Sequence, residues 1–198
     1  MTVPPDLSSF RSDGAPGGGA WAALHASAVV APLPAVGAVR LTGPDRSDFL
    51  HGQAAADVRT APPGGSVRTL FLDVKGHARW EARVQRRKDD LHLAVEDGAA
   101  AAVAAHLSRH VIFDAVEVHD LSGTLATVTV QGPRVDAVLA ALGTGVPEAD
   151  RFVAVPFENG ELLIHPARRS EAGGVDVHLL APQRPAVLEA LQRAGAVG

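Results

Sequence analysis

The sequence predicts an α+β protein of two similar subdomains, each an antiparallel sheet with helices packed on one side. Two observations lead to this prediction. Each half of the chain runs strand, helix, several strands, helix, and short turn sequences typical of hairpins separate several of the strands. The predicted units are a disordered tail rich in Pro, Gly and Ser at 1–19, a first subdomain at 20–122 and a second at 123–198. The halves share this element order and no obvious residue-level repeat.

The first regular elements follow the predicted tail. Residues 37–43 alternate between apolar and polar types, as expected of a half-buried strand. Pro44 and Asp45 suit the first turn of a helix. That helix is expected to bury Phe49 and Leu50.

The next two strands, at 66–74 and 78–84, flank a tight corner. Gly76 supplies the positive φ that a two-residue hairpin needs, and Lys75, one of the two lysines of the chain, keeps the tip soluble. The alternation in the second strand predicts a half-buried antiparallel strand. The corner is therefore a turn, and whether a ligand also meets it is a separate question.

The remaining elements follow from alanine-rich or alternating segments and from turn signals, of which Asn159-Gly160 is the strongest. They are a strand at 91–97, a helix at 98–110, a strand at 124–130, a helix at 132–143, hairpin strands at 151–157 and 161–167, a strand at 174–182 and a helix at 184–195.

Composition excludes several classes of function. The formal net charge is −4 and the 18 basic residues are spread along the chain, so nucleic acid is a poor partner. Without cysteine, the chain forms no disulfide, thiolate metal site or cysteine nucleophile. No targeting signal or apolar membrane segment is evident, so we expect a cytoplasmic protein that does not bind membranes.

The histidines do not form a convincing metal site. His106 and His110 have the i, i+4 spacing of two ligands, but the zinc-protease glutamate and a third ligand are absent. His92, His119 and His178 occur singly in alternating strands, where we expect them to fill a sheet face. No Gly-x-Ser-x-Gly elbow supports a hydrolase triad.

Two carboxylates stand where strands meet loops. Asp57 follows "HGQAAA" and Asp73 follows "LFL". Each caps a turn or helix in one interpretation, and lines a pocket between the two halves in the other. The residues alone leave both interpretations open.

Four segments together resemble a known family. "LTGPDRSDFLHGQAAADV", "FLDVKGHARW", "HVIFDAVEVHDLS" and "VTVQGPRVDAVLAAL" occur in the order found in YgfZ-type folate-binding proteins, which are relatives of the glycine-cleavage T-protein (aminomethyltransferase). The resemblance runs from about Gly37 to the C-terminus. It implies an aminomethyltransferase folate-binding-like fold, whose two subdomains, with a third segment, enclose tetrahydrofolate. For YgfZ-type members it also implies support of iron–sulfur protein assembly or repair.

The resemblance places a tetrahydrofolate site at the corner of the first half, faced by a helix start in the second half. The pteridine offers donors and acceptors to carboxylates or amides, its glutamate tail suits basic side chains, and an aromatic ring can stack on it. The implied binding residues are Asp57, Asp73, Lys75, Gly76, Arg79, Trp80, Gln131 and Gly132.

The chain departs from the family pattern in two ways. The YgfZ hallmark Lys-Gly-Cys-Tyr-x-Gly-Gln-Glu is absent, which implies a protein partner that supplies the missing C-terminal segment. Where the T-protein carries its acidic pair, this chain has Trp80 and Glu81. Alternation places Glu81 on the face opposite Trp80, where we expect it to be badly placed for orienting the pterin-side amine. In "SEAGGVDV", Glu171 or Asp176 matches a further family acid.

Three functions therefore stay open. The first is a folate-binding protein like YgfZ, with little or no catalysis. The second is an aminomethyltransferase-like one-carbon transferase that uses Glu81 as its catalytic acid. The third is a degenerate, non-catalytic subunit of a folate-linked oxidase, comparable to the sarcosine oxidase gamma subunit.

Overall fold

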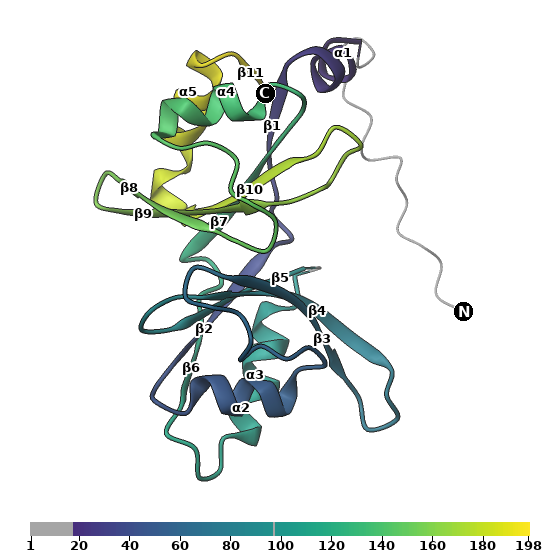
Figure 1. Ribbon diagram of the computed structural model, residues 1–198, viewed down its shortest axis with the longest axis vertical. Helices are drawn as coiled ribbons and strands as arrows, with labels where there is room; N and C mark the ends of the chain where they lie inside the picture. Colours follow the sequence, from purple (N-terminus) through teal and green to yellow (C-terminus); the bar gives the residue numbers. More distant parts are fainter. Residues whose placement is uncertain (1–17, 97) are drawn as a thin grey trace.

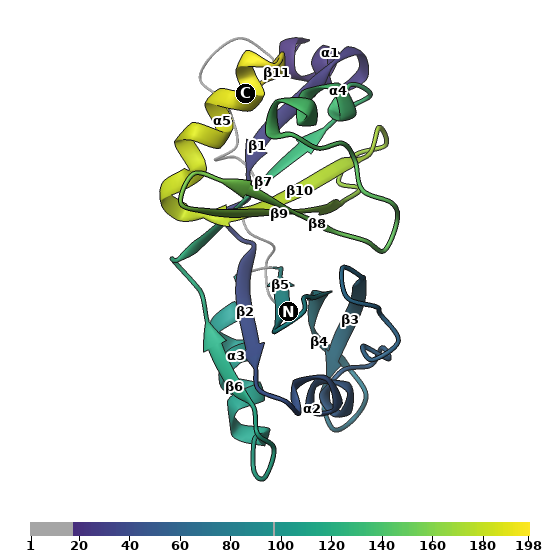
Figure 2. The same ribbon diagram turned by 60° about the vertical axis from the view of Figure 1, so that its left-hand side comes forward.

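Two sheets face each other at the centre of the molecule, and helices cover their outer sides (Figures 1 and 2). The computed structural model describes residues 18–96 and 98–198. The first sheet has five strands in the order β3-β4-β5-β2-β6, and the second has six in the order β11-β1-β7-β10-β9-β8. All pairings are antiparallel except that of β1 with β11. The predicted α+β architecture of two antiparallel sheets with helices is confirmed.

The first sheet is built from one continuous stretch of chain. Its strands are β2 (Gly37–Thr42), β3 (Ser66–Leu72), β4 (Ala78–Arg86), β5 (Leu91–Val95) and β6 (Glu117–Asp120). Helices α2 (Arg46–Gln53) and α3 (Ala100–His110) pack on its outer face. They bury the expected Phe49 and Leu50 together with Val103 and Leu107.

The second sheet combines both ends of the chain. Its strands are β1 (Ala28–Pro32), β7 (Leu125–Gln131), β8 (Val153–Phe157), β9 (Gly160–Pro166), β10 (Gly174–Leu180) and β11 (Ala196–Val197). Helices α1 (Gly18–Ala26), α4 (Val135–Leu139) and α5 (Arg184–Arg193) accompany it. Two 3₁₀ turns, Ala140–Leu142 and Ala181–Gln183, adjoin α4 and α5.

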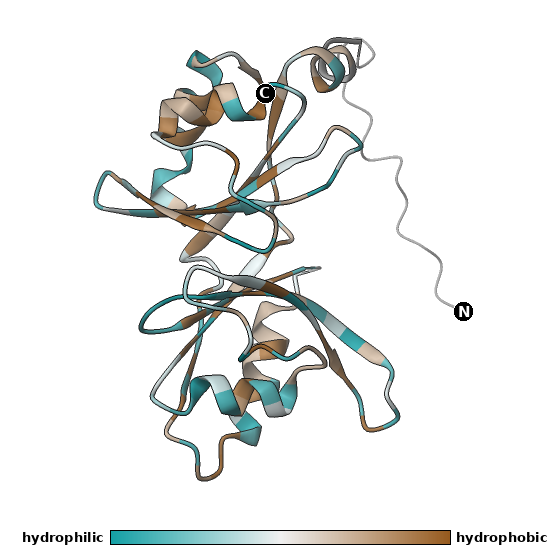
Figure 3. Ribbon diagram, viewed as in Figure 1, coloured by the Kyte–Doolittle hydropathy of each residue, from teal (hydrophilic) through white to brown (hydrophobic). Residues whose placement is uncertain are grey.

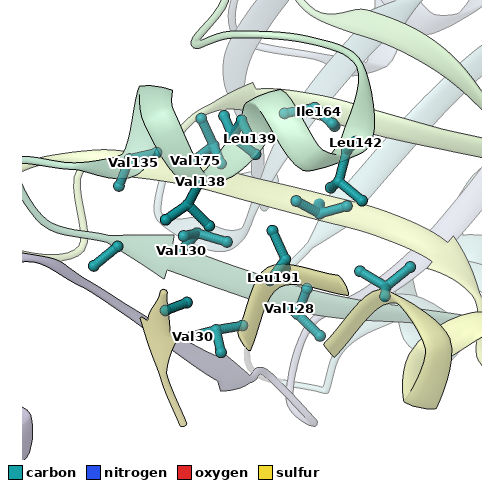
Figure 4. Close-up of a cluster of buried hydrophobic side chains, with 14 of the residues drawn as sticks. Val30, Val128, Val130, Val135, Val138, Leu139, Leu142, Ile164, Val175 and Leu191 are labelled. Atoms are coloured by element: carbon teal, nitrogen blue, oxygen red, sulfur yellow. The ribbon is translucent and has the colours of Figure 1, made fainter. Parts of the chain in front are cut away.

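The outer face of the second sheet forms a dry core under α4 and α5. Figure 4 shows branched side chains from β1, β7, β9 and β10 meeting those of the helices, among them Val130, Leu139 and Leu191. In Figure 3, much of α4 is coloured hydrophobic, whereas α2 on the other sheet is largely hydrophilic. Burial of such side chains is the main stabilising contribution of the fold.

The inner faces, where the sheets meet, are polar. Along β10, Val175, Val177 and Leu179 enter the core, while Asp176 and His178 alternate to the other face and are nonetheless buried. Gln85, His92, Thr127, Thr129, Gln131 and His165 are buried on inner faces in the same way. Because an unpaired buried polar group is costly, the hydrogen bonds within this layer matter for the stability of the fold.

The predicted domain division differs from the structure at its N-terminal end. Residues 20–122 were expected to form the first subdomain, yet β1 pairs with β7 and β11 of the second sheet. Ala28 and Val30 of β1 thus contribute to the apolar core of the second sheet. The predicted tail at 1–19 lies largely outside the described residues, and its last two residues begin α1.

The β3–β4 hairpin also differs in detail from the prediction. Asp73 N donates to His77 O and Gly76 N donates to Asp73 O, so three residues, rather than two, form the loop. Gly76 has a φ of +82° at the left-handed position, as expected for a glycine there. A register shift opposite Phe71 and Leu72 places a bulge at Arg79, which interrupts the predicted alternation.

Candidate functional site

A charged cleft lies between the two sheets on the side of the β9–β10 loop. We call it the inter-sheet cleft. Its inner part, of about 100 Å³, is lined from the first sheet by Glu81, Arg83 and Glu96 and from the second by His165 and Asp176. Its outer part, of about 450 Å³, shares Arg68, Arg83, Ala167 and Arg168 with the inner part and adds Glu171.

Glu81 faces this cleft from β4. Its Oε1 accepts a hydrogen bond from Arg68 Nε at 2.9 Å, and the two side chains form an ion pair. Trp80 lies on the opposite face, beside the helices, as the alternation predicted. The face of Glu81 is the one that lines the cleft, whereas the expectation that this carboxylate is badly placed for orienting the pterin-side amine stays a prediction.

A buried ion pair closes the inner end of the cleft and links the sheets. Arg169 Nε donates to both carboxylate oxygens of Asp176 at 2.9 and 3.0 Å, and Arg169 Nη2 donates to Glu96 Oε1 at 2.8 Å. The Asp176 carboxylate raises the pKa of Arg169 above its usual value. Burial lowers the pKa of the neighbouring Arg83. Asp176 is thereby occupied within the protein, while Glu81 and Glu171 border the open part.

Three predicted residues meet in a second pocket, on the outer side of the first sheet. Asp73, Arg79 and Trp80 line this corner pocket of about 510 Å³ together with His106 and Arg109. The Arg79 guanidinium carbon lies 5.5 Å from the centre of the Trp80 ring, and the edge of His106 contacts the same ring at 5.3 Å. The pocket offers an indole and several cationic groups.

The two loop carboxylates mainly stabilise turns. Asp73 accepts hydrogen bonds from the backbone N–H groups of Lys75 and His77 at 2.8 and 3.0 Å, which lower the pKa of its carboxyl. Asp57 accepts from the side chain and the backbone N–H of Arg59, which lower its pKa in the same way. Lys75 and Gly76 lie at the tip of a hairpin that points away from the second sheet (Figure 1).

Gln131 and Gly132 do not face the corner, which corrects the prediction for the second half. The corner pocket is lined only by residues between 52 and 110. Gln131 is buried at the end of β7, where its amide bonds Thr129 and Ala167 and accepts from Arg169 N. Gly132 has a φ of +132°, and a Cβ there would come within 2.5 Å of Ser27 O. Both residues join β7 to its neighbours, so their role here is structural.

Sequence reasoning missed a trio of buried histidines between the sheets. His165 and His178 approach through their Nε2 atoms at 3.0 Å, and the rings of His178 and His92 lie 5.3 Å apart. Thr127 Oγ1 contacts His178 Nδ1 at 2.8 Å, and His165 Nδ1 contacts the carbonyl of Pro166 at 3.0 Å. The single histidines in alternating strands were the available signal.

These contacts define neutral tautomers. His165 donates from Nδ1 to the Pro166 carbonyl, so its Nε2 accepts from His178 Nε2–H, and His178 Nδ1 accepts from Thr127. Burial lowers the pKa of His92 to about 3 and that of His165 to about 4, and it lowers the pKa of His178 as well. The trio is therefore uncharged at neutral pH.

The other histidines form no ligand set. The rings of His106 and His110 have centres 4.5 Å apart and are tilted by 48°, and His110 Nδ1 contacts the His106 carbonyl at 2.8 Å. Within residues 18–96 and 98–198, no group of three or more His, Asp or Glu side chains is placed to hold a metal ion. In the same part of the chain, no helix has the length and apolarity needed to cross a membrane.

Comparison with known proteins assigns the family. The model of the family described as "GCVT N-terminal domain" matches residues 20–196. The chain belongs to this family. The expected T-protein-like, aminomethyltransferase-like superfamily is confirmed, whereas the closer resemblance to YgfZ stays a prediction.

Individual relatives agree with this assignment. The aminomethyltransferase of Saccharopolyspora erythraea is 26% identical over 178 residues, which cover 88% of this chain and 48% of that protein. The structure of glycine cleavage system aminomethyltransferase T from Bartonella henselae matches with a TM-score of 0.74 at 19% identity, over 83% of this chain and 45% of the other. A chain of the heterotetrameric sarcosine oxidase from Corynebacterium sp. U-96 matches with a TM-score of 0.58 at 15% identity, over 86% of this chain and 87% of the other. The matched part of this chain covers 27% to 48% of the length of these curated relatives.

Proposed function

We propose that this GCVT-family chain binds tetrahydrofolate in the inter-sheet cleft. One observation carries the proposal: the acids that the family resemblance points to, Glu81, Glu171 and Asp176, come from distant segments and line one cleft. The predicted corner residues do not converge with Gln131 and Gly132 in this way. The cleft therefore replaces the corner as the preferred site.

The chemistry of the cleft suits the polar ends of a folate. The pterin amine and its ring N–H are donors, and carboxylates line both parts of the cleft, Glu81 in the inner part and Asp150 and Glu171 in the outer part. Arg68, Arg83 and Arg168 suit the carboxylates of the glutamate tail. None of the described residues that line the cleft is Phe, Tyr or Trp, so the charges, rather than stacking on such a ring, would supply the affinity.

A calorimetric titration with (6S)-tetrahydrofolate tests the proposal. We expect micromolar binding, and Glu81→Gln should weaken it about tenfold because a charge-assisted hydrogen bond is lost. Glu189→Gln is the matched control, because Glu189 forms a similarly exposed ion pair with Arg193 on α5. Millimolar or absent binding by the unmodified chain would exclude the proposed function.

The same titration separates the two candidate locations. Arg79→Met removes a cation from the corner pocket and leaves the cleft intact. If Arg79→Met weakens folate binding and Glu81→Gln does not, the ligand occupies the corner pocket beside Asp73 and Trp80.

The bound folate has two candidate uses, and a non-catalytic subunit is a third option. The first is the YgfZ-like role in iron–sulfur protein assembly or repair, which would require a partner carrying the absent cysteine segment. Deleting the gene should then lower the activity of iron–sulfur enzymes, and normal activity would exclude this role.

The position of Glu81 in the cleft favours the second candidate, an aminomethyltransferase-like one-carbon transferase. Tetrahydrofolate would supply the amine that accepts the one-carbon unit, and Glu81 would hold the proton beside it. Folate-dependent turnover should be lost in Glu81→Gln, and turnover that survives would refute this role for Glu81. The third option, a non-catalytic subunit, predicts a larger flavoprotein that co-purifies with the chain and no turnover.

A further inference from the structure

A second inter-sheet pocket lies on the other side of the histidine trio, away from the cleft. We call it the Arg40 pocket. It has a volume of about 280 Å³ and is lined from both sheets and from the β6–β7 connection. Its lining residues are Arg40, Arg87, His92, Leu121, Thr124, Leu125, Gly160, Glu161, Leu163, His178, Leu179 and Leu180. It shares no lining residue with the inter-sheet cleft.

Two polar groups in this pocket lack partners. Arg40 Nε and His92 Nε2 are both buried without a hydrogen bond in the described structure. His92 is 2% exposed. Its Nδ1 contacts Gln85 Oε1 at 2.7 Å, and because Oε1 only accepts, Nδ1 carries the proton. His92 Nε2 is thus a free acceptor, and leaving a buried polar atom unpaired is costly.

Arg40 is the cation of the wall without an ion-pair partner. Arg87 forms ion pairs with Glu161 and Asp90. Among the described residues, Arg40 takes part in no such ion pair, so its guanidinium is the one in the wall that is available to an anionic group. A carboxylate is a suitable partner for a guanidinium.

The remaining wall is apolar. Leu121, Leu125, Leu163, Leu179 and Leu180 contribute aliphatic surface. The volume of the Arg40 pocket is slightly below the usual range for ligand sites, so the pocket suits a small molecule. A ligand that is complementary to all of these groups needs an anionic group, a hydrogen-bond donor close to it and an aliphatic chain.

We propose that the Arg40 pocket binds a small aliphatic 2-hydroxy or 2-amino carboxylic acid. The carboxylate pairs with Arg40, the hydroxyl or amino group donates to His92 Nε2, and the aliphatic chain contacts the leucines. This site is separate from the cleft proposed for folate and does not depend on it.

Three probes of similar shape test the proposal by calorimetry on the full chain: 2-hydroxy-4-methylpentanoate, 4-methylpentanoate and 4-methyl-1-pentanol. We expect the hydroxy acid to bind with millimolar affinity or better. Loss of the hydroxyl should weaken binding about tenfold, because His92 Nε2 stays unpaired. Loss of the carboxylate should weaken it at least as much. Equal binding of all three probes, or none by any, overturns the proposal.

Variants locate the site. Arg40→Met keeps the apolar stem, and should weaken binding of the hydroxy acid at least tenfold. The matched control is Arg134→Met, since Arg134 is exposed and does not line the pocket. Thr124→Phe serves if Arg40→Met fails to fold, because the exposed Thr124 can place a ring in the pocket mouth without disturbing the core. Unchanged binding in Thr124→Phe and a folded Arg40→Met would refute the site.

An NMR readout is specific to the contact with His92. Binding of the hydroxy acid should move the ¹⁵N resonance of His92 Nε2, whereas that of the exposed His110 should stay unchanged. Binding that leaves His92 Nε2 unaffected would contradict the proposed contact.

Discussion

The outer and inner faces of the same sheets are built from different chemistry. In β9, Leu162 and Ile164 enter a dry core, while the alternate residue His165 joins a buried polar layer. The outer faces need only shape and apolarity, which many side chains satisfy. The inner faces need each polar atom to have a partner, and the places where partners are lacking, or where charges border open space, are the candidate sites. The outer faces thus mainly stabilise the fold, and the inner faces supply the candidate binding sites.

The two faces should differ most in how their contribution to stability changes at acidic pH. The buried histidines are neutral when folded, with pKa values lowered to about 3 for His92 and about 4 for His165, whereas histidines of the unfolded chain titrate near 6.5. Below about pH 6.5 the unfolded chain binds more protons than the folded chain. The buried neutral histidines make their full contribution to the free energy of unfolding above that pH. This contribution is lost progressively as the pH falls toward 4.

Each such histidine should lower the free energy of unfolding by about 1.4 kcal/mol per pH unit in this range. Urea unfolding between pH 7.5 and 5 measures the slope. His178→Gln removes one buried site and should flatten the slope, whereas His110→Gln on the exposed end of α3 should not. A slope that is identical in all three proteins would contradict the neutral trio.

A cavity in the outer core should have the next largest effect. Ile164 is fully buried under the helices of the second sheet, so Ile164→Ala should destabilise the protein by about 3 to 4 kcal/mol at any pH. Its neighbour Leu163 faces the Arg40 pocket, where space already exists. Leu163→Ala should cost about 2 kcal/mol or less, and equal losses for the two variants would show that the faces are packed alike.

A broken ion pair in the inner layer should cost somewhat less than the core cavity. Asp176→Asn leaves Arg169 without its main partner, but Arg169 keeps Glu96 and is partly exposed. We expect a loss of about 2 kcal/mol, below the usual range for a fully buried pair, measured by urea unfolding in low and in high salt. A gain in stability would show that desolvation of the pair outweighs its attraction.

Much of the fold could be predicted because the outer faces follow simple periodicity. The alternation in β4 and β10 and the alanine-rich α3 fixed the element types, and the hairpin at Asn159 and Gly160 closed as expected. Strand β1 was not predicted, because the first strand was expected only at 37–43. A short apolar strand fits either sheet equally well, and only its pairing with β7 and β11 decides.

The site was harder to predict because polar residues of one inner face need residues of the other. Asp73, Arg79 and Trp80 are neighbours in sequence and line one pocket. The meeting of Glu81 with Arg168 and Glu171 depends on how two sheets stack, which no local pattern encodes. For the same reason, His92 and His178 were expected only as single face-filling residues, and His165 was not singled out at all.

The smallest effect is expected for an ion pair of the inner layer that borders open space. The side chains of Glu81 and Arg68 are 39% and 66% exposed, so water screens their attraction. Glu81→Gln should therefore change the free energy of unfolding by about 0.5 kcal/mol or less, as measured by urea unfolding beside Asp176→Asn. A loss as large as that of Asp176→Asn would mean that Glu81 holds the sheets together. A near-zero change in the free energy of unfolding, combined with weaker folate binding, would assign Glu81 to ligand binding. Within one polar layer, burial would then decide which charges stabilise the fold and which are available to a ligand.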